Sequence, residues 1–96
     1  MEKLGQEVIV QRLEEYPAWS QNGDALQRTF NFGDFNGAMA FVNHIAALAE
    51  QSQHHPDIMI RYNKVTLTLS THDAGGLTER DFAFARAANR TLGEGG

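Results

Sequence analysis

The segment from residue 58 to residue 70 constrains the fold more than any other part of the sequence. Apolar and polar residues alternate along it on both sides of Asn63-Lys64, a pair with turn chemistry. Because successive side chains of a strand point to opposite faces, this pattern predicts two antiparallel strands joined as a hairpin. Such a hairpin belongs to an antiparallel sheet with one face packed on a core.

Three helical patterns and a second hairpin signal surround this segment. Apolar residues recur at helical spacing from Leu4 to Tyr16, from Asp34 to Glu50 and from Thr78 to Leu92. A turn signal at residues 22–24, Asn-Gly-Asp, predicts a hairpin between the first two helices. The predicted fold class is α+β, an antiparallel four-stranded sheet with three helices on one face, in the order α-β-β-α-β-β-α.

The long central helix has more apolar residues than one stripe needs. Asp34 is its predicted N-cap, and the core-facing stripe is predicted to contain Phe35, Ala38, Met39, Val42, Ile45, Ala46 and Ala49. Phe41 and Leu48 fall on another face of the same helix. We expect this second apolar face to be buried between copies of the chain in a homo-oligomer, a homodimer or a homotetramer.

Size and composition narrow the class of protein. A chain of 96 residues is expected to form a single domain, residues 1–96, and the absence of cysteine excludes disulfides and thiolate metal sites. The formal charge of −4 argues against a nucleic-acid surface, since that needs a basic excess. No signal peptide or membrane span is predicted, and a cytoplasmic protein is expected.

Three of the four histidines bracket the predicted hairpin of residues 58–70. If Asn63 and Lys64 form a two-residue loop, Tyr62 faces Val65, and continuing the ladder places His72 opposite His55. His54 lies one residue further out. These three imidazoles would form a cluster in which some are neutral bases while another holds a proton.

This histidine cluster also fits interpretations other than acid and base catalysis. Adjacent histidines before a proline are often an exposed helix end, and three histidines with a carboxylate could hold zinc or iron. The spacing matches neither His-Glu-x-x-His nor a zinc finger, and no metal is predicted. Asp81, three residues after Thr78, is by pattern alone a capping-box carboxylate.

The second half of the chain contains four short motifs, EQSQHHP at 50–56, YNKV at 62–65, LSTH at 69–72 and GLTERD at 76–81. In residues and in order, these motifs resemble those of the pterin-4a-carbinolamine dehydratase family. The likeness extends to Trp19, where the family has a tryptophan closing its first helix.

The resemblance implies a lyase that dehydrates 4a-hydroxytetrahydropterin to quinonoid dihydropterin. It would recycle the tetrahydrobiopterin of aromatic amino-acid hydroxylases without a metal or a cofactor of its own. By resemblance, His54 and His72 would be the acid and base, and His55 would bind and orient the pterin. Glu50 would fix the imidazole of His54. The substrate would be bordered by Thr71, Asp73 and the main chain beside Pro56, with Asp81 in the pocket wall.

Two departures from the family pattern bear on substrate affinity. Gln53 stands where the family often has an acid, and Ile58 where it often has a tryptophan. Animal members also serve as dimerisation cofactors of a transcription factor. The alternative function is therefore a protein-binding module with a vestigial pterin pocket.

Overall fold

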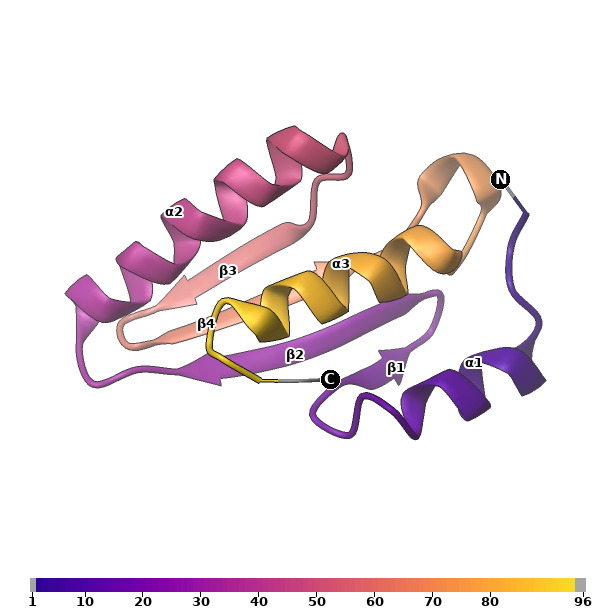
Figure 1. The fold of residues 1–96 in the computed structure, drawn as a ribbon, viewed down its shortest axis with the longest axis horizontal. Coiled ribbons are helices and arrows are strands. Elements are labelled where there is room, and N and C mark those ends of the chain that lie inside the picture. The colour runs from indigo at the N-terminus through magenta and orange to yellow at the C-terminus, as the bar shows by residue number, and fades with distance from the viewer. Residues whose placement is uncertain (1, 95–96) are drawn as a thin grey trace.

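The computed structural model describes residues 2–94 and confirms the predicted order of elements (Figure 1). The two hairpins form one antiparallel sheet with the strand order β1-β2-β4-β3. A 3₁₀ turn, η1, occupies His72–Ala74 between the last strand and the last helix. The elements are α1 Gln6–Leu13, β1 Ser20–Asn22, β2 Ala25–Asn31, α2 Phe35–Ser52, β3 Asp57–Arg61, β4 Lys64–Leu69 and α3 Glu79–Arg90.

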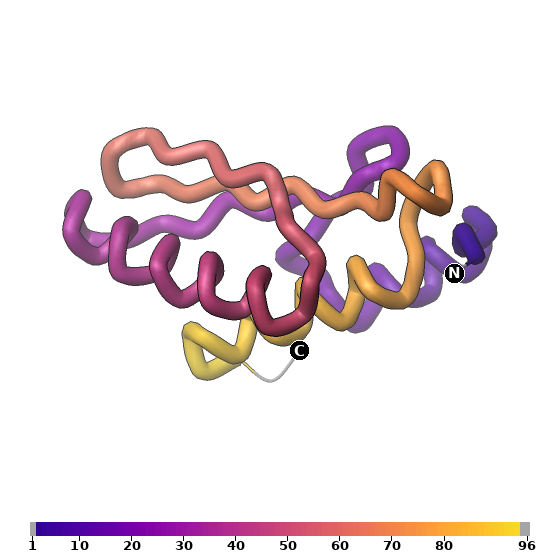
Figure 2. The backbone as a smooth tube through the Cα atoms, turned by 90° about the horizontal axis from the view of Figure 1, so that it is seen from above, coloured from indigo at the N-terminus to yellow at the C-terminus, as the bar shows by residue number. Residues whose placement is uncertain are grey.

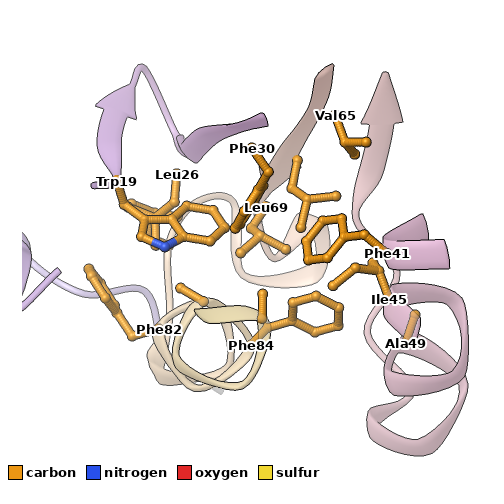
Figure 3. Close-up of a cluster of buried hydrophobic side chains, with 14 of the residues drawn as sticks. Trp19, Leu26, Phe30, Phe41, Ile45, Ala49, Val65, Leu69, Phe82 and Phe84 are labelled. Atoms are coloured by element: carbon orange, nitrogen blue, oxygen red, sulfur yellow. The ribbon is translucent and has the colours of Figure 1, made fainter. Parts of the chain in front are cut away.

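The three helices cover one face of the sheet, as predicted (Figure 2). The hydrophobic core lies between these two layers, where inward-facing residues of β2 and β4 meet α2 and α3 (Figure 3). Leu26, Val65, Leu67 and Leu69 have no exposed surface. Trp19 is also buried and donates its indole N–H to Asn89 Oδ1 at 2.8 Å, which joins the first hairpin to the end of α3. Within residues 2–94, no helix has the length and apolar character needed to cross a membrane.

Side-chain caps fix where the two long helices begin. Asp34 is the N-cap of α2, and its Oδ1 accepts the Gly37 N–H at 2.8 Å. Thr78 and Asp81 form the predicted capping box at the start of α3. The first helix is shorter than the apolar pattern predicts, because the Leu4 N–H donates to Leu77 O and holds that residue outside α1.

The buried face of α2 differs from the predicted stripe. Phe41, expected on an outer face, is 4% exposed, and its ring lies 4.5 Å from that of Phe30 and 5.1 Å from that of Phe32 (Figure 3). Phe35, expected to face the core, is 46% exposed. The apolar pattern of α2 is wide enough to fit either face, and the rings of Phe30 in β2 and of Phe32 just after it select the face with Phe41. Leu48 is half-buried against the core.

The second hairpin is confirmed, but its predicted register is wrong. Arg61 pairs with Lys64, so the loop is Tyr62-Asn63, with Tyr62 in the left-handed region at φ 51°. Asn63 is held in this position because its Nδ2 donates to Phe32 O and its own carbonyl accepts the Phe32 N–H, both at 2.8 Å. The ladder ends at the pair Asp57 and Thr68. His72 therefore does not pair with His55 in a continued ladder.

Candidate active site

A hollow of about 260 Å³ lies where the end of α2, the end of β4 and the start of α3 come together. The three predicted histidines all line it, two from the loop after α2 and one from η1. The sheet brings these two segments together, because the loop after α2 leads into β3, η1 follows β4, and the two strands are paired. The lining residues are Gln53, His54, His55, Ser70, Thr71, His72, Asp73 and Arg80.

His54 is the most firmly held of the three histidines. It is buried, and its Nε2 lies 2.6 Å from Oδ1 of Asp81, which has no exposed surface. The ring also packs edge-on against Phe84, with centroids 6.2 Å apart. A carboxylate at one ring nitrogen fixes both the orientation and the tautomer of an imidazole. Nδ1 of His54 is therefore the nitrogen that remains for other chemistry.

Two threonines hold the Asp81 carboxylate in place. Its Oδ2 accepts the Thr71 hydroxyl at 2.8 Å and the Thr78 N–H at 2.9 Å. The two threonine hydroxyls are 2.8 Å apart. Since the single proton of the Thr71 hydroxyl goes to Asp81, the Thr78 hydroxyl donates to Thr71. Asp81 thus serves as a capping-box residue and as the partner of His54 at the same time.

Glu50 has a different partner from the one expected. It was predicted to fix His54, but its Oε2 lies 2.6 Å from Nε2 of His55. Both side chains of this pair are largely exposed. The cause is the end of α2: Gln53 adopts the left-handed conformation, which turns His54 inward and leaves His55 on the side of Glu50. Asp81 takes the role predicted for Glu50.

His72 and Asp73 lie on the outer side of the hollow, in the turn η1. Both are exposed. Gly75 ends the turn at φ 76°, a conformation that glycine adopts without steric cost, and Thr71 forms a bridge with Gly76. The turn therefore closes on itself and presents the imidazole of His72 towards solvent at the mouth of the hollow.

Three other predicted site residues do not line the hollow. Of the described residues 2–94, Glu50, Pro56 and Asp81 are not among those that border the hollow. Ser70, Gln53 and Arg80 border it and were not predicted as site residues. Gln53 and Ser70 are sequence neighbours of predicted residues, which was an available signal. Arg80 likewise neighbours the predicted Asp81, but its reach to the end of α2 depends on how α3 packs there, which the sequence does not show.

The site can accept and donate protons. It combines a buried imidazole held by a carboxylate with two solvent-accessible imidazoles around one hollow. Such an arrangement suits general acid and base catalysis on a small polar ligand. In the described part of the chain, no three His, Asp or Glu side chains converge as metal ligands would.

Comparison with known proteins points to one family. Residues 2–91 match the family described as Pterin 4 alpha carbinolamine dehydratase. A relative from Thermomicrobium roseum, which carries the provisional name pterin-4-alpha-carbinolamine dehydratase, is 57% identical over 86 residues, covering 90% of this chain and 92% of its own.

Two solved structures share the fold. The transcriptional coactivator/pterin dehydratase from Brucella melitensis superposes with a TM-score of 0.91 at 34% identity, covering 96% of this chain and 100% of that one. A pterin dehydratase-like protein described as a RuBisCO assembly factor in the alpha-carboxysome gives a TM-score of 0.68 at 30% identity, covering 80% and 92% of the two chains.

Proposed function

The chain belongs to the pterin-4-alpha-carbinolamine dehydratase family, and we propose that it removes water from 4a-hydroxytetrahydropterin to give quinonoid dihydropterin. One observation carries this proposal: all three histidines border one hollow, and one of them is held by a buried carboxylate. The product would return to the cofactor cycle of an aromatic amino-acid hydroxylase, in the cytoplasm.

The reaction needs one proton donor and one proton acceptor. The bond between C4a and the hydroxyl oxygen breaks, and the oxygen takes up a proton and leaves as water. A ring nitrogen loses its proton, and the electrons of that N–H bond form the new C=N bond. Atoms and charge balance without a redox partner, so acid and base groups supplied by the protein suffice.

His54 is the proposed base. An ionised Asp81 accepts the proton on Nε2 of His54, which leaves the lone pair on Nδ1 when the ring is neutral. The imidazolium that forms after proton uptake would be stabilised by the same carboxylate. Burial of both groups fixes this geometry before the substrate arrives.

His72 is the proposed acid, and His55 the residue that orients the pterin. The imidazole of His72 sits at the mouth of the hollow, where it can exchange protons with water between turnovers. His55 is tied to Glu50 on the other side, so its ring is oriented by a carboxylate too. Either ring could touch a ligand that lies between them.

Two further lining residues, Ser70 and Asp73, are proposed to contribute to substrate affinity. Ser70 and Asp73 offer polar groups to the pterin edges, while Thr71 is occupied in holding Asp81. Ile58 lies in β3, where it pairs with Leu67 and packs against the core. It provides no aromatic ring for stacking on a pterin, so we expect weaker substrate binding than in members with tryptophan there.

We also propose that the protein forms a homo-oligomer, through a surface other than Phe41. β3 is an edge strand, and exposed edge strands with apolar side chains are templates for pairing with another chain. Met59 is 51% and Ile60 38% exposed on this strand. Phe35, 46% exposed, adds apolar surface at the start of α2.

A second candidate function is protein binding without catalysis. One solved relative favours this candidate, because it is pterin dehydratase-like and yet is described as a RuBisCO assembly factor. A binding module would have no need of the buried pair of His54 and Asp81. The two functions therefore differ in whether the hollow turns over a pterin.

The direct test is a stopped-flow assay with chemically generated 4a-hydroxytetrahydropterin. The protein is expected to accelerate dehydration, before and after dialysis against a strong chelator. No acceleration at micromolar protein would refute the enzyme and leave the binding module. Activity that disappears on chelation and returns with zinc or iron would instead support a metal-dependent reaction.

A further inference from the structure

Arg80 reaches from α3 to the end of α2, two elements far apart in sequence but adjacent in space (Figure 2). Its Nη2 donates to the carbonyl oxygen of Gln53 at 2.5 Å and lies 3.5 Å from that of Ser52. The Gln53 carbonyl belongs to the peptide group that leads directly into His54. Arg80 therefore binds the main chain immediately before the buried His54.

This hydrogen bond lies at a position where the backbone is strained. Gln53 has φ 53° and ψ 40°, the left-handed conformation, which is unfavourable for a residue with a side chain. In addition, α2 carries no basic residue in its own last turn to meet its unpaired carbonyls. The guanidinium of Arg80 supplies a charge-assisted donor to these carbonyls and so stabilises the left-handed turn.

Together these contacts hold His54 at three points. The backbone N–H of His54 donates to Ala49 O at 3.2 Å. The Gln53 carbonyl before it accepts from Arg80, and the His54 ring is bound by Asp81. Arg80 and Asp81 are consecutive residues in the first turn of α3. The first turn of α3 thus fixes both the main chain and the ring of His54.

We propose that Arg80 is a positioning residue for His54, a role that rests on the proposed dehydratase function. By fixing the left-handed turn at Gln53, it aims the His54 ring between Asp81 and the hollow. Without the guanidinium, the Gln53 peptide can rotate towards an unstrained conformation. The ring would then lose alignment with the substrate, and a displacement of about 1 Å can cost up to 10²-fold in rate.

The test compares Arg80→Met with Arg86→Met as the matched control. Arg86 is exposed on the same helix, so both variants lose one positive charge from α3. The first readout is the pair of ¹⁵N ring signals of His54 by NMR without substrate. The second is kcat and KM in the dehydration assay, and the third is the thermal midpoint.

In Arg80→Met, we expect displaced or broadened His54 ring signals and a kcat about 10-fold lower, with a smaller change in KM. Arg86→Met should match the unmodified protein in both respects. Arg80→Lys, which keeps a donor and a charge, should recover part of kcat.

Unchanged His54 signals in a folded Arg80→Met protein would overturn the inference, even if the thermal midpoint fell, because a merely structural role predicts that result. Should Arg80→Met fail to fold, Arg80→Gln against Arg86→Gln is judged by the same signals. An unmodified protein without turnover would refute the proposed function alone, since the NMR readout needs no substrate.

Discussion

At the scale of single residues, Asp81 links the fold to the chemistry. One of its oxygens holds the ring of His54, and the other accepts from the Thr71 hydroxyl and from the backbone N–H of Thr78, the N-cap of α3. A pattern of Thr78 followed by Asp81 predicts the cap correctly. It cannot predict the partner 27 residues earlier, because that contact depends on how α3 docks against the end of α2.

Replacing Asp81 with Asn should therefore affect stability and turnover together. The amide keeps the shape but loses the charge that holds His54, and a poorly satisfied buried group costs about 1–3 kcal/mol. We expect a lower free energy of unfolding by urea denaturation and at least a 10-fold loss of turnover. Asp57→Asn, at an exposed carboxylate of β3, is the control. Asp81→Asn with full turnover would contradict the role given to this carboxylate.

At the scale of elements, long-range contacts between side chains decide details that periodicity leaves open. The two-residue loop of the second hairpin is set by Asn63, which is bound to Phe32, the residue after β2. The buried face of α2 is set by the rings of Phe30 in β2 and of Phe32, which pack against Phe41. Helix and strand patterns predict the elements and their order because those depend on local periodicity alone.

The contact between α1 and α3 gives a pH-dependent prediction. Arg12 forms a two-bond ion pair with Glu79, and hydrogen bonding by this guanidinium lowers the pKa of Glu79 below its ordinary value. A lowered pKa means that the pair stabilises the fold above the ordinary glutamate pKa of about 4.3, and that this contribution is lost as pH falls through the folded value. Both side chains are exposed to solvent, so the contribution should stay below about 1 kcal/mol.

Glu79→Gln should accordingly lower the thermal midpoint slightly near neutral pH. The difference from the unmodified protein should vanish as the pH falls through the lowered pKa of Glu79, and it should shrink in high salt. Glu14→Gln, at another exposed carboxylate near the end of α1, serves as the control. A difference that persists unchanged in acid would show that Glu79 acts through packing and not through its charge.

At the scale of the whole molecule, the hollow is assembled from three places in the sequence. The pairing of β3 with β4 brings residues 53–55 and 70–73 together, and α3 adds Arg80. The sequence predicts the histidine cluster because His54, His55 and His72 lie just outside the two ends of the hairpin. It does not predict the inward turn of His54 and the outward position of His55, since those depend on the left-handed Gln53.

The exposed edge strand β3 carries the prediction on assembly. Light scattering at micromolar concentration should give a mass above that of one chain, since an unpaired apolar edge favours pairing with a second copy. Ile60→Lys should shift the protein towards monomer, because a charge on an edge strand opposes such pairing. Ser20→Lys, on the other edge strand β1, should leave the mass unchanged. A monomeric unmodified protein would contradict this assignment.

The central claim is that the histidines around the hollow perform acid and base catalysis on a pterin. Its most direct measurement is single-turnover stopped-flow dehydration of 4a-hydroxytetrahydropterin by His72→Ala, with His44→Ala on the exposed side of α2 as the matched control. We predict a loss of about 10²-fold or more for His72→Ala, with an unchanged thermal midpoint and full activity in the control. Full turnover by His72→Ala would contradict the account.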